Sequence, residues 1–182
     1  MLTDKIWLHY IGSYSFDVAN MIDCLATIGE HAVQLECNNA VNGWGVIFFQ
    51  ECNETLLKFV RACSNEGRER VLVVATNPSN LSQGESWNLL CAGAGDVLIL
   101  KNYNETASVI ADKFKRWRKI EELLNSDLVS ENLIGRSPVW IATLRQIIEV
   151  AQFTDSSILI TGESGTGKEL VSRLIHTIDQ RH

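Results

Sequence analysis

The stretch RVLVVATNPSNLSQGESWNLLCAGAGDVLIL, from Arg70 to Leu100, decides the fold class of this chain. It begins with an apolar run that predicts a strand at 70–76. A short helical pattern around Trp87, Leu89 and Leu90 follows, and a second apolar run predicts another strand at 95–100. Apolar strands separated by an amphipathic helix are typical of a parallel sheet buried on both faces. The stretch therefore predicts one crossover unit of an α/β domain.

The same alternation extends toward the N-terminus. Apolar runs predict three further strands at 5–10, 31–37 and 45–49. Between the first two lies a helical pattern that Ser15 would cap and Gly29 would end, and a second helical pattern at 56–63 would end at Gly67. The sequence thus predicts a doubly wound, five-stranded parallel α/β sheet.

The composition excludes several classes of protein. The chain has 182 residues, of which 46% are hydrophobic and 21% are charged, so it can bury a sizeable core. A net charge of −6 argues against wrapping nucleic acid, since phosphate neutralisation needs surplus lysine and arginine. No apolar run approaches the roughly 18 residues of a membrane span, and the N-terminus lacks a signal pattern. We expect a cytoplasmic protein with no membrane partner.

The five cysteines give no metal or disulfide pattern. They are odd in number and lack CxxC or Cys/His ligand spacing. We expect reduced core thiols and no metal site; the residues are Cys24, Cys37, Cys52, Cys63 and Cys91.

The region 1–104 resembles a response-regulator receiver domain. The resemblance rests on VVAT (73–76) and CAGAGDVLIL (91–100), which look like a receiver's fourth strand ending in threonine and its fifth strand with the preceding turn. It implies that Thr76 holds the switch position. An unrelated flavodoxin-like sensor is the alternative.

The acidic residues of a receiver are missing from the positions where the resemblance implies them. Tyr10 and Ile11 end the first strand and Gln50 ends the third, so neither a Mg²⁺ cage nor an acyl-phosphate nucleophile is formed. Lys101 follows the fifth strand one residue later than the receiver lysine. Asp17 and Glu51 lie nearby but out of register. We expect a receiver-like fold without phosphorylation chemistry.

A long helical pattern covers 105–125 and forms the predicted linker helix of 105–130. Its apolar stripe has two interpretations, which the sequence leaves open. The stripe packs on the domain core, or its C-terminal half projects as a homodimer seam. The seam residues would be Trp117, Ile120 and Leu124.

A phosphate-binding motif lies near the C-terminus. Ser137 and Pro138 predict the start of a helix, and SSILIT (156–161) predicts a strand. The strand leads into GESGTGKE, which satisfies GxxxxGK. Glycines let successive N–H groups face inward, the next helix directs its positive dipole end to the phosphates, and the lysine reaches the β and γ phosphates. The candidate nucleotide-binding residues are Gly162, Glu163, Ser164, Gly165, Thr166, Gly167, Lys168 and Glu169.

The last fifty residues closely resemble the opening of the AAA+ domain of sigma-54-dependent transcriptional activators. Glu169 stands where most P-loops carry the serine or threonine that ligates Mg²⁺, but GESGTGKE with glutamate is this family's own form. The resemblance implies ATP and Mg²⁺ as cofactors, with Thr166 or Glu169 near the metal. It also places Ile134 and Gly135 beside the adenine, within an AAA+ region that we predict to begin at 131.

The resemblance further implies parts that these 182 residues do not contain. They are a Walker B acidic pair, a GAFTGA loop, sensor and finger arginines and a DNA-binding domain, through which such proteins meet sigma-54 RNA polymerase and DNA. We therefore expect a fragment or truncated product without catalytic residues or ATPase activity of its own. The alternative is a stand-alone dimerisation or interaction module with a vestigial P-loop. A P-loop kinase or transporter ATPase is disfavoured because of Glu169.

Overall fold

A computed structural model describes residues 5–35, 43–65, 68–77, 79, 81–130, 135 and 137–179. The chain divides into two compact units, Met1–Phe114 and Lys115–His182. Each unit is described by itself below. The division falls within the long helix, whereas the predicted domain boundaries at 105 and 131 stay predictions.

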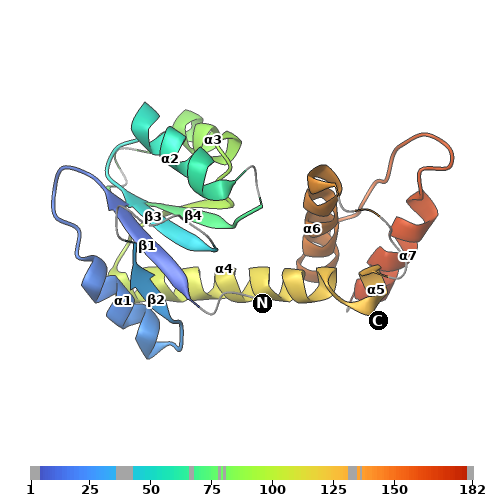
Figure 1. Cartoon of the computed structure of the whole chain (residues 1–182), viewed down its shortest axis with the longest axis horizontal. Coiled ribbons are helices and arrows are strands. Elements are labelled where there is room, and N and C mark those ends of the chain that lie inside the picture. Colours follow the sequence, from blue (N-terminus) through green and yellow to red (C-terminus); the bar gives the residue numbers. More distant parts are fainter. Residues whose placement is uncertain are drawn as a thin grey trace. The chain divides into compact units, whose positions relative to one another are not determined.

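The first unit is built on one parallel sheet of five strands (Figure 1). The strands are β1 (Ile6–Ile11), β2 (Ala32–Gln34), β3 (Gly45–Phe49), β4 (Val71–Ala75) and β5 (Asp96–Ile99). Their order is β2-β1-β3-β4-β5, with Phe48 opposite Tyr10 on one side and Val74 on the other. This is the flavodoxin-like strand order, so the predicted receiver-like fold is confirmed.

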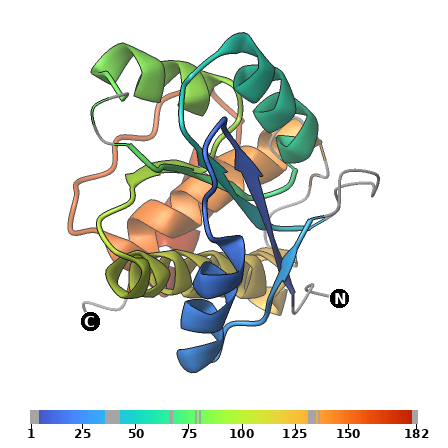
Figure 2. The same ribbon diagram turned by 90° about the vertical axis from the view of Figure 1, so that its left-hand side faces the viewer.

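Helices cover both faces of the sheet. Helices α2 (Glu54–Ser64) and α3 (Gln83–Cys91) lie on one face, and α1 (Val18–Thr27) lies on the other with the first half of α4 (Tyr103–Leu124) (Figures 1 and 2). Every residue of β3 and β4 is buried, as expected for central strands covered on both sides.

Two predicted helix ends are wrong by a few residues. Asp17, not Ser15, caps α1, because its carboxylate directly precedes the first turn and accepts a hydrogen bond from the Asn20 N–H at 3.0 Å. Helix α2 ends at Ser64, and the following C-cap residue Asn65 has a φ of 46°, in the left-handed region that asparagine tolerates. The predicted stop at Gly67 lies outside the described residues.

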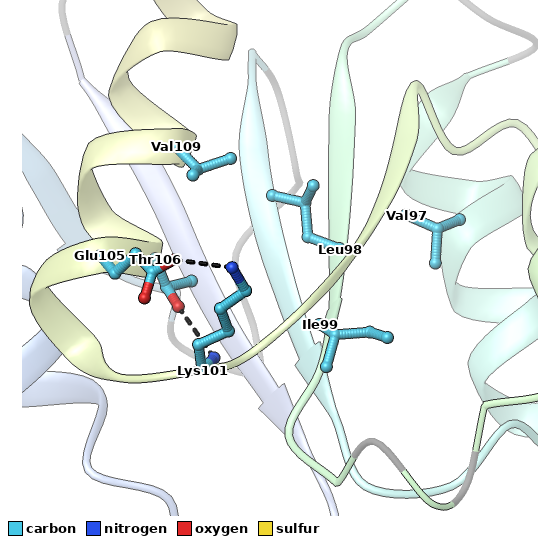
Figure 3. A pocket seen from close by; sticks show the side chains of 7 residues that line it. All are labelled: Val97, Leu98, Ile99, Lys101, Glu105, Thr106 and Val109. Atoms are coloured by element: carbon cyan, nitrogen blue, oxygen red, sulfur yellow. Dashed lines mark hydrogen bonds and ion pairs between the residues drawn. The ribbon is translucent and has the colours of Figure 1, made fainter.

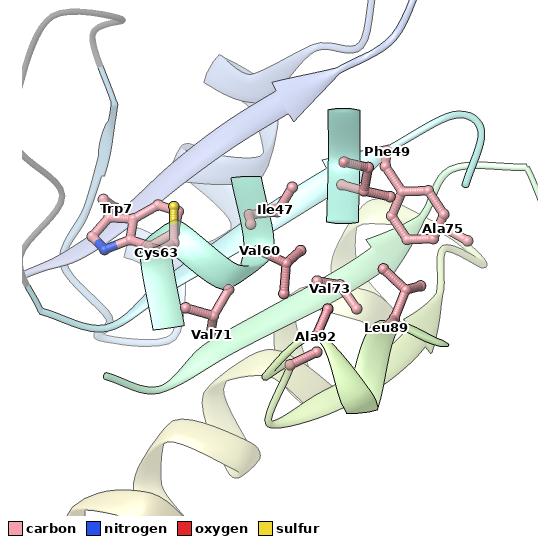
Figure 4. Close-up of a cluster of buried hydrophobic side chains, with 12 residues drawn as sticks. Trp7, Ile47, Phe49, Val60, Cys63, Val71, Val73, Ala75, Leu89 and Ala92 are labelled. Atoms are coloured by element: carbon pink, nitrogen blue, oxygen red, sulfur yellow. The ribbon is translucent and has the colours of Figure 1, made fainter. Parts of the chain in front are cut away.

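The core under α2 and α3 is a contiguous apolar cluster (Figure 4). Phe49, Val73 and Leu89 are fully buried in it, and Cys63 joins them at 1% exposure. The expectation that the cysteines are core thiols is correct for Cys63 but wrong for Cys91, which is exposed. The four described cysteines are free thiols, and Cys37 lies outside the described residues.

The second unit consists of helices. It holds the second half of α4, the short α5 (Asp127–Ser130), α6 (Pro138–Phe153) and α7 (Lys168–Ile178). Ser137 caps α6 as predicted, with its hydroxyl accepting from the Trp140 N–H at 3.2 Å. Two ion pairs, Arg116–Glu149 and Arg145–Glu121, join α4 to α6.

The predicted strand at 156–161 is wrong. These residues lead from α6 to the P-loop without regular secondary structure, and Leu159 is 87% exposed. A strand needs a partner for its backbone, and the described residues of this unit contain none. The apolar run alone therefore does not make a strand here.

The C-terminal half of α4 is not an open seam. Trp117 and Ile120 are buried within the chain, at 2% and 0% exposure, and Leu124 is half-buried. This favours the packing interpretation of the stripe for these two residues. A homodimer therefore needs another surface.

Candidate functional site

The carboxyl ends of β1, β3 and β4 form the edge where a receiver would hold its phosphate. Thr76 follows β4, and both its backbone N–H and its hydroxyl donate to the Phe49 carbonyl oxygen, at 2.8 and 2.9 Å. Gln50 follows β3, and its side-chain oxygen accepts from the Ser13 N–H at 3.0 Å. The side chains of Thr76 and Gln50 are thus both hydrogen-bonded to backbone groups at this edge of the sheet.

Lys101, which follows β5, forms an ion pair with a residue of α4 (Figure 3). Its ammonium lies 2.7 Å from Glu105 Oε1, one turn into α4, and this carboxylate raises the pKa of Lys101. The structure therefore brings Lys101 together with Glu105, a partner that the sequence did not suggest.

An aromatic cluster lies at the same edge. The Phe16 ring contacts those of Tyr10, Phe48 and Tyr103, with centroid distances of 5.4, 4.6 and 5.6 Å. Gly12 makes room for it, because a Cβ there would lie 2.1 Å from the Tyr10 hydroxyl oxygen. Burial raises the pKa of the Tyr10 phenol. Sequence reasoning missed Phe16, since an aromatic residue before a helix carries no specific signal.

None of Tyr10, Gln50 and Thr76 carries a carboxylate. An acceptor site needs a carboxylate nucleophile and oxygen ligands for Mg²⁺. No group of three or more histidines, cysteines or acids able to hold a metal ion occurs within the described residues. Gln50, Thr76 and Tyr10 are held at this edge by hydrogen bonds and ring contacts between neutral groups.

The P-loop lies between α6 and α7 and is open to solvent. Gly165 and Gly167 have φ of 82° and 80°, a backbone conformation that glycine adopts readily. Helix α7 begins at Lys168, and its hydrogen bonding starts with the Val171 N–H donating to the Gly167 carbonyl oxygen at 3.1 Å. The preceding N–H groups of the first turn therefore point out of the helix, where an anion can accept from them.

Side chains of the motif fold over the loop. The Lys168 ammonium donates to the carbonyl oxygens of Gly162 at 3.0 Å and Glu163 at 2.5 Å. The Thr166 hydroxyl also donates to the Glu163 carbonyl oxygen, at 2.8 Å. The structure thus brings the lysine to the mouth of the loop. Ser164 is exposed beside these residues.

Glu169 points along its own helix. Its carboxylate pairs with Arg173 at 2.7 Å, an exposed contact one turn further on. The two candidate metal neighbours therefore face different partners: Thr166 faces the loop, and Glu169 faces α7.

Gly135 lies against the indole of Trp140. A Cβ at Gly135 would be 2.5 Å from Trp140 Cδ1, so the close approach requires glycine. The backbone N–H of Trp140 donates to the Ser137 hydroxyl oxygen of the helix cap. Ile134, the other predicted adenine neighbour, lies outside the described residues.

Sequence reasoning also missed the contact between Glu121 and Arg145. Arg145 Nε donates to Glu121 Oε1 at 2.6 Å and Nη2 donates to Oε2 at 3.2 Å. Two residues 24 positions apart on different helices carry no local pattern, so only the packing of α4 on α6 reveals the pair.

Comparison with known families supports the sequence resemblance. Residues 133–182 match the family profile described as the Sigma-54 interaction domain. The formate hydrogenlyase transcriptional activator FhlA of Escherichia coli is 47% identical over 62 residues, which are 34% of this chain and 9% of that protein. The Nif-specific regulatory protein of Bradyrhizobium diazoefficiens is 49% identical over 49 residues, 27% of this chain and 8% of that protein. The resemblance to sigma-54-dependent activators is confirmed for the matched segment, which spans about a tenth of these relatives.

Two solved structures share weaker similarity. NtrX from Brucella abortus in complex with ADP has a TM-score of 0.48 at 21% identity, covering 97% of this chain and 41% of that one. HP1043, an orphan response regulator of H. pylori, has a TM-score of 0.43 at 16% identity, covering 59% of this chain and 95% of that one. Among the described residues, no helix is both long and apolar enough to cross a membrane.

Proposed function

We propose that this protein is a regulator of sigma-54-dependent transcription that binds ATP with Mg²⁺ at its P-loop. The observation that carries the proposal is the geometry of residues 162–168 at the start of α7, within the segment matching the Sigma-54 interaction domain. Sigma-54 RNA polymerase and DNA are the partners that this family implies, and the bacterial cytoplasm is where such a regulator would act.

Three features of the P-loop support nucleotide binding. The left-handed glycines turn the backbone, the first turn of α7 offers free N–H groups, and Lys168 supplies a cation. The triphosphate would replace the carbonyl oxygens of Gly162 and Glu163 as the acceptors for the ammonium. The Thr166 hydroxyl, which now donates to the Glu163 carbonyl oxygen, would lie near a bound metal, and Glu163, Ser164 and Glu169 would border the phosphates.

We further propose that the first unit regulates without accepting a phosphoryl group. Gln50 and Tyr10 stand at the strand ends where acids would be needed, and both are bound within the edge. A partner protein or a small ligand, rather than phosphotransfer, would then be the signal. A homodimer is also part of this proposal, but not through the predicted seam on α4, since two of its three residues are buried within the chain.

The nucleotide proposal is tested by titrating the full chain with a fluorescent ATP analogue and Mg²⁺. We expect saturable binding that Lys168→Ala weakens at least tenfold, because the ammonium is the only side-chain cation of the motif. Lys58→Ala is the matched control, since Lys58 is an exposed lysine near the start of α2. Equal binding by wild type and Lys168→Ala would refute the proposal.

A further inference from the structure

Helix α7 carries an acid directly beside the lysine of the P-loop. Glu169 follows Lys168 in the first turn of the helix, whose N–H groups lack intrahelical acceptors and are proposed above to hold the phosphates. A triphosphate is itself an anion. The Glu169 carboxylate therefore repels the ligand that this end of the helix would bind.

An ion pair with Arg173 directs this carboxylate along the helix. Arg173 Nη2 lies 2.7 Å from Glu169 Oε1, and the acid precedes the base by four residues, the favourable order of charges on a helix. Both side chains are largely exposed, so the pair contributes little to the free energy of unfolding. A role of this pair would therefore lie in nucleotide binding rather than in folding.

The charges of the motif and the following turn balance only when Arg173 is counted. Residues 162–173 contain two acids, Glu163 and Glu169, and two bases, Lys168 and Arg173. Lys168 is the base that would contact the phosphates, and the whole chain has a net charge of −6. Without Arg173 this segment would be net negative and would repel an anion more strongly.

We propose that Arg173 is a positioning residue for the nucleotide, which holds the Glu169 carboxylate away from the phosphates and offsets its charge. Arg173 acts through Glu169 and does not contact the phosphates. This role rests on the proposed nucleotide binding and deepens it, because it assigns a function to a residue outside GxxxxGK.

The test is a titration of the full chain with the fluorescent analogue mant-ATP and Mg²⁺. We expect Arg173→Ala to raise the dissociation constant about three- to tenfold, because the carboxylate then faces the phosphates without its partner. Arg173→Lys should stay within about twofold of wild type, since it restores a cation four residues after the acid. The effect of Arg173→Ala should also shrink as KCl is raised, because mobile ions screen exposed charges.

A double variant separates this role from a direct contact between Arg173 and the ligand. In a Glu169→Gln background, Arg173→Ala should change the dissociation constant less than about twofold, because no carboxylate remains to be held. An equal loss in both backgrounds would overturn the positioning role. Glu169→Gln alone should bind at least as tightly as wild type. Weaker binding by that variant would show that the carboxylate serves the ligand, and would also overturn the proposal.

Lys58→Ala is the matched control. Lys58 pairs with Glu54 at the start of α2, likewise as an exposed acid and base four residues apart, but that helix follows no P-loop. It should leave the dissociation constant unchanged, and a loss equal to that of Arg173→Ala would overturn the proposal. A wild-type chain that binds no mant-ATP would refute the proposed function itself. Binding by wild type that Arg173→Ala leaves unchanged would overturn only the role of Arg173.

Discussion

Gln50 and Thr76 are neutral side chains at the carboxyl edge of the sheet, where phosphoryl acceptance would need a carboxylate. Gln50 and Thr76 bind backbone atoms of the Ser13 and Phe49 segments. That these side chains are neutral could be predicted from the sequence. The contacts of the Phe16 ring with neighbouring aromatic rings could not, because they depend on the folded structure. Each hydrogen bond of Gln50 and Thr76 removes a polar group from solvent and gives it a partner.

Phosphoryl donors should therefore leave the chain unmodified. We expect no phosphorylated species by intact-mass spectrometry after incubation with acetyl phosphate and Mg²⁺. Gln50→Asp should behave in the same way, because Tyr10 still occupies the position at the end of β1 where a metal-binding acid is needed. A phosphorylated residue in the wild-type chain would show that the edge retains receiver chemistry.

The buried thiol of Cys63 gives stability a dependence on alkaline pH. Burial raises its pKa from 9.0 to about 11, so the folded chain keeps a proton that the unfolded chain has lost. Stability is then lost as pH rises from 9 through 11, by about 2 kcal/mol over that window.

Cys63→Ala isolates this effect, since the alanine variant loses the thiol and keeps every other titrating group. Urea unfolding at pH 8 and pH 11 should show a larger fall in the free energy of unfolding for wild type than for the variant. Equal falls would mean that the Cys63 thiol has the same pKa in the folded and unfolded chain, which would contradict the shift.

At the scale of elements, the sequence predicts the first unit better than the second. Apolar runs predict β1 to β5 because their partners are other apolar runs of the same chain. The run at 156–161 has the same pattern but no partner strand among the described residues, so it stays irregular. Helix ends depend on single capping contacts, which explains why Asp17 displaced Ser15.

The P-loop motif was predictable in position and in backbone conformation, since its glycines demand special φ values. The side-chain contacts were not. The pairing of Glu169 with Arg173 and the approach of Trp140 to Gly135 depend on rotamers and packing that residue spacing does not define. The ion pair of Glu121 and Arg145 likewise depends on helix packing and could not be predicted from residue spacing.

That ion pair should be important for the packing of α4 on α6. The side chains are only 10% and 17% exposed, so removing the carboxylate leaves a guanidinium without its main partner in a poorly hydrated place. We expect Glu121→Ala to lower the free energy of unfolding by about 2 kcal/mol in urea.

The exposed pair on α7 is the comparison for this prediction. Glu169 and Arg173 are 79% and 73% exposed, so Glu169→Ala should cost less than about 0.5 kcal/mol. If the two variants lose the same stability, the α4–α6 pair is no more than a surface contact.

At the scale of the whole molecule, one chain joins a receiver-like unit to a unit that carries a P-loop. Helix α4 supplies residues to both units, so it is the covalent and helical connection between them. Under the proposed function, the first unit holds the regulatory surface and the second holds the nucleotide.

Hydrogen exchange of the full chain with and without ATP and Mg²⁺ tests the central claim most directly, because the loop is proposed to hold phosphate through its backbone N–H groups. The account predicts slower exchange in peptides covering 162–170, and no slowing in the same peptides of Lys168→Ala. Unchanged exchange in those peptides at saturating nucleotide, or slowing that persists in Lys168→Ala, would contradict it.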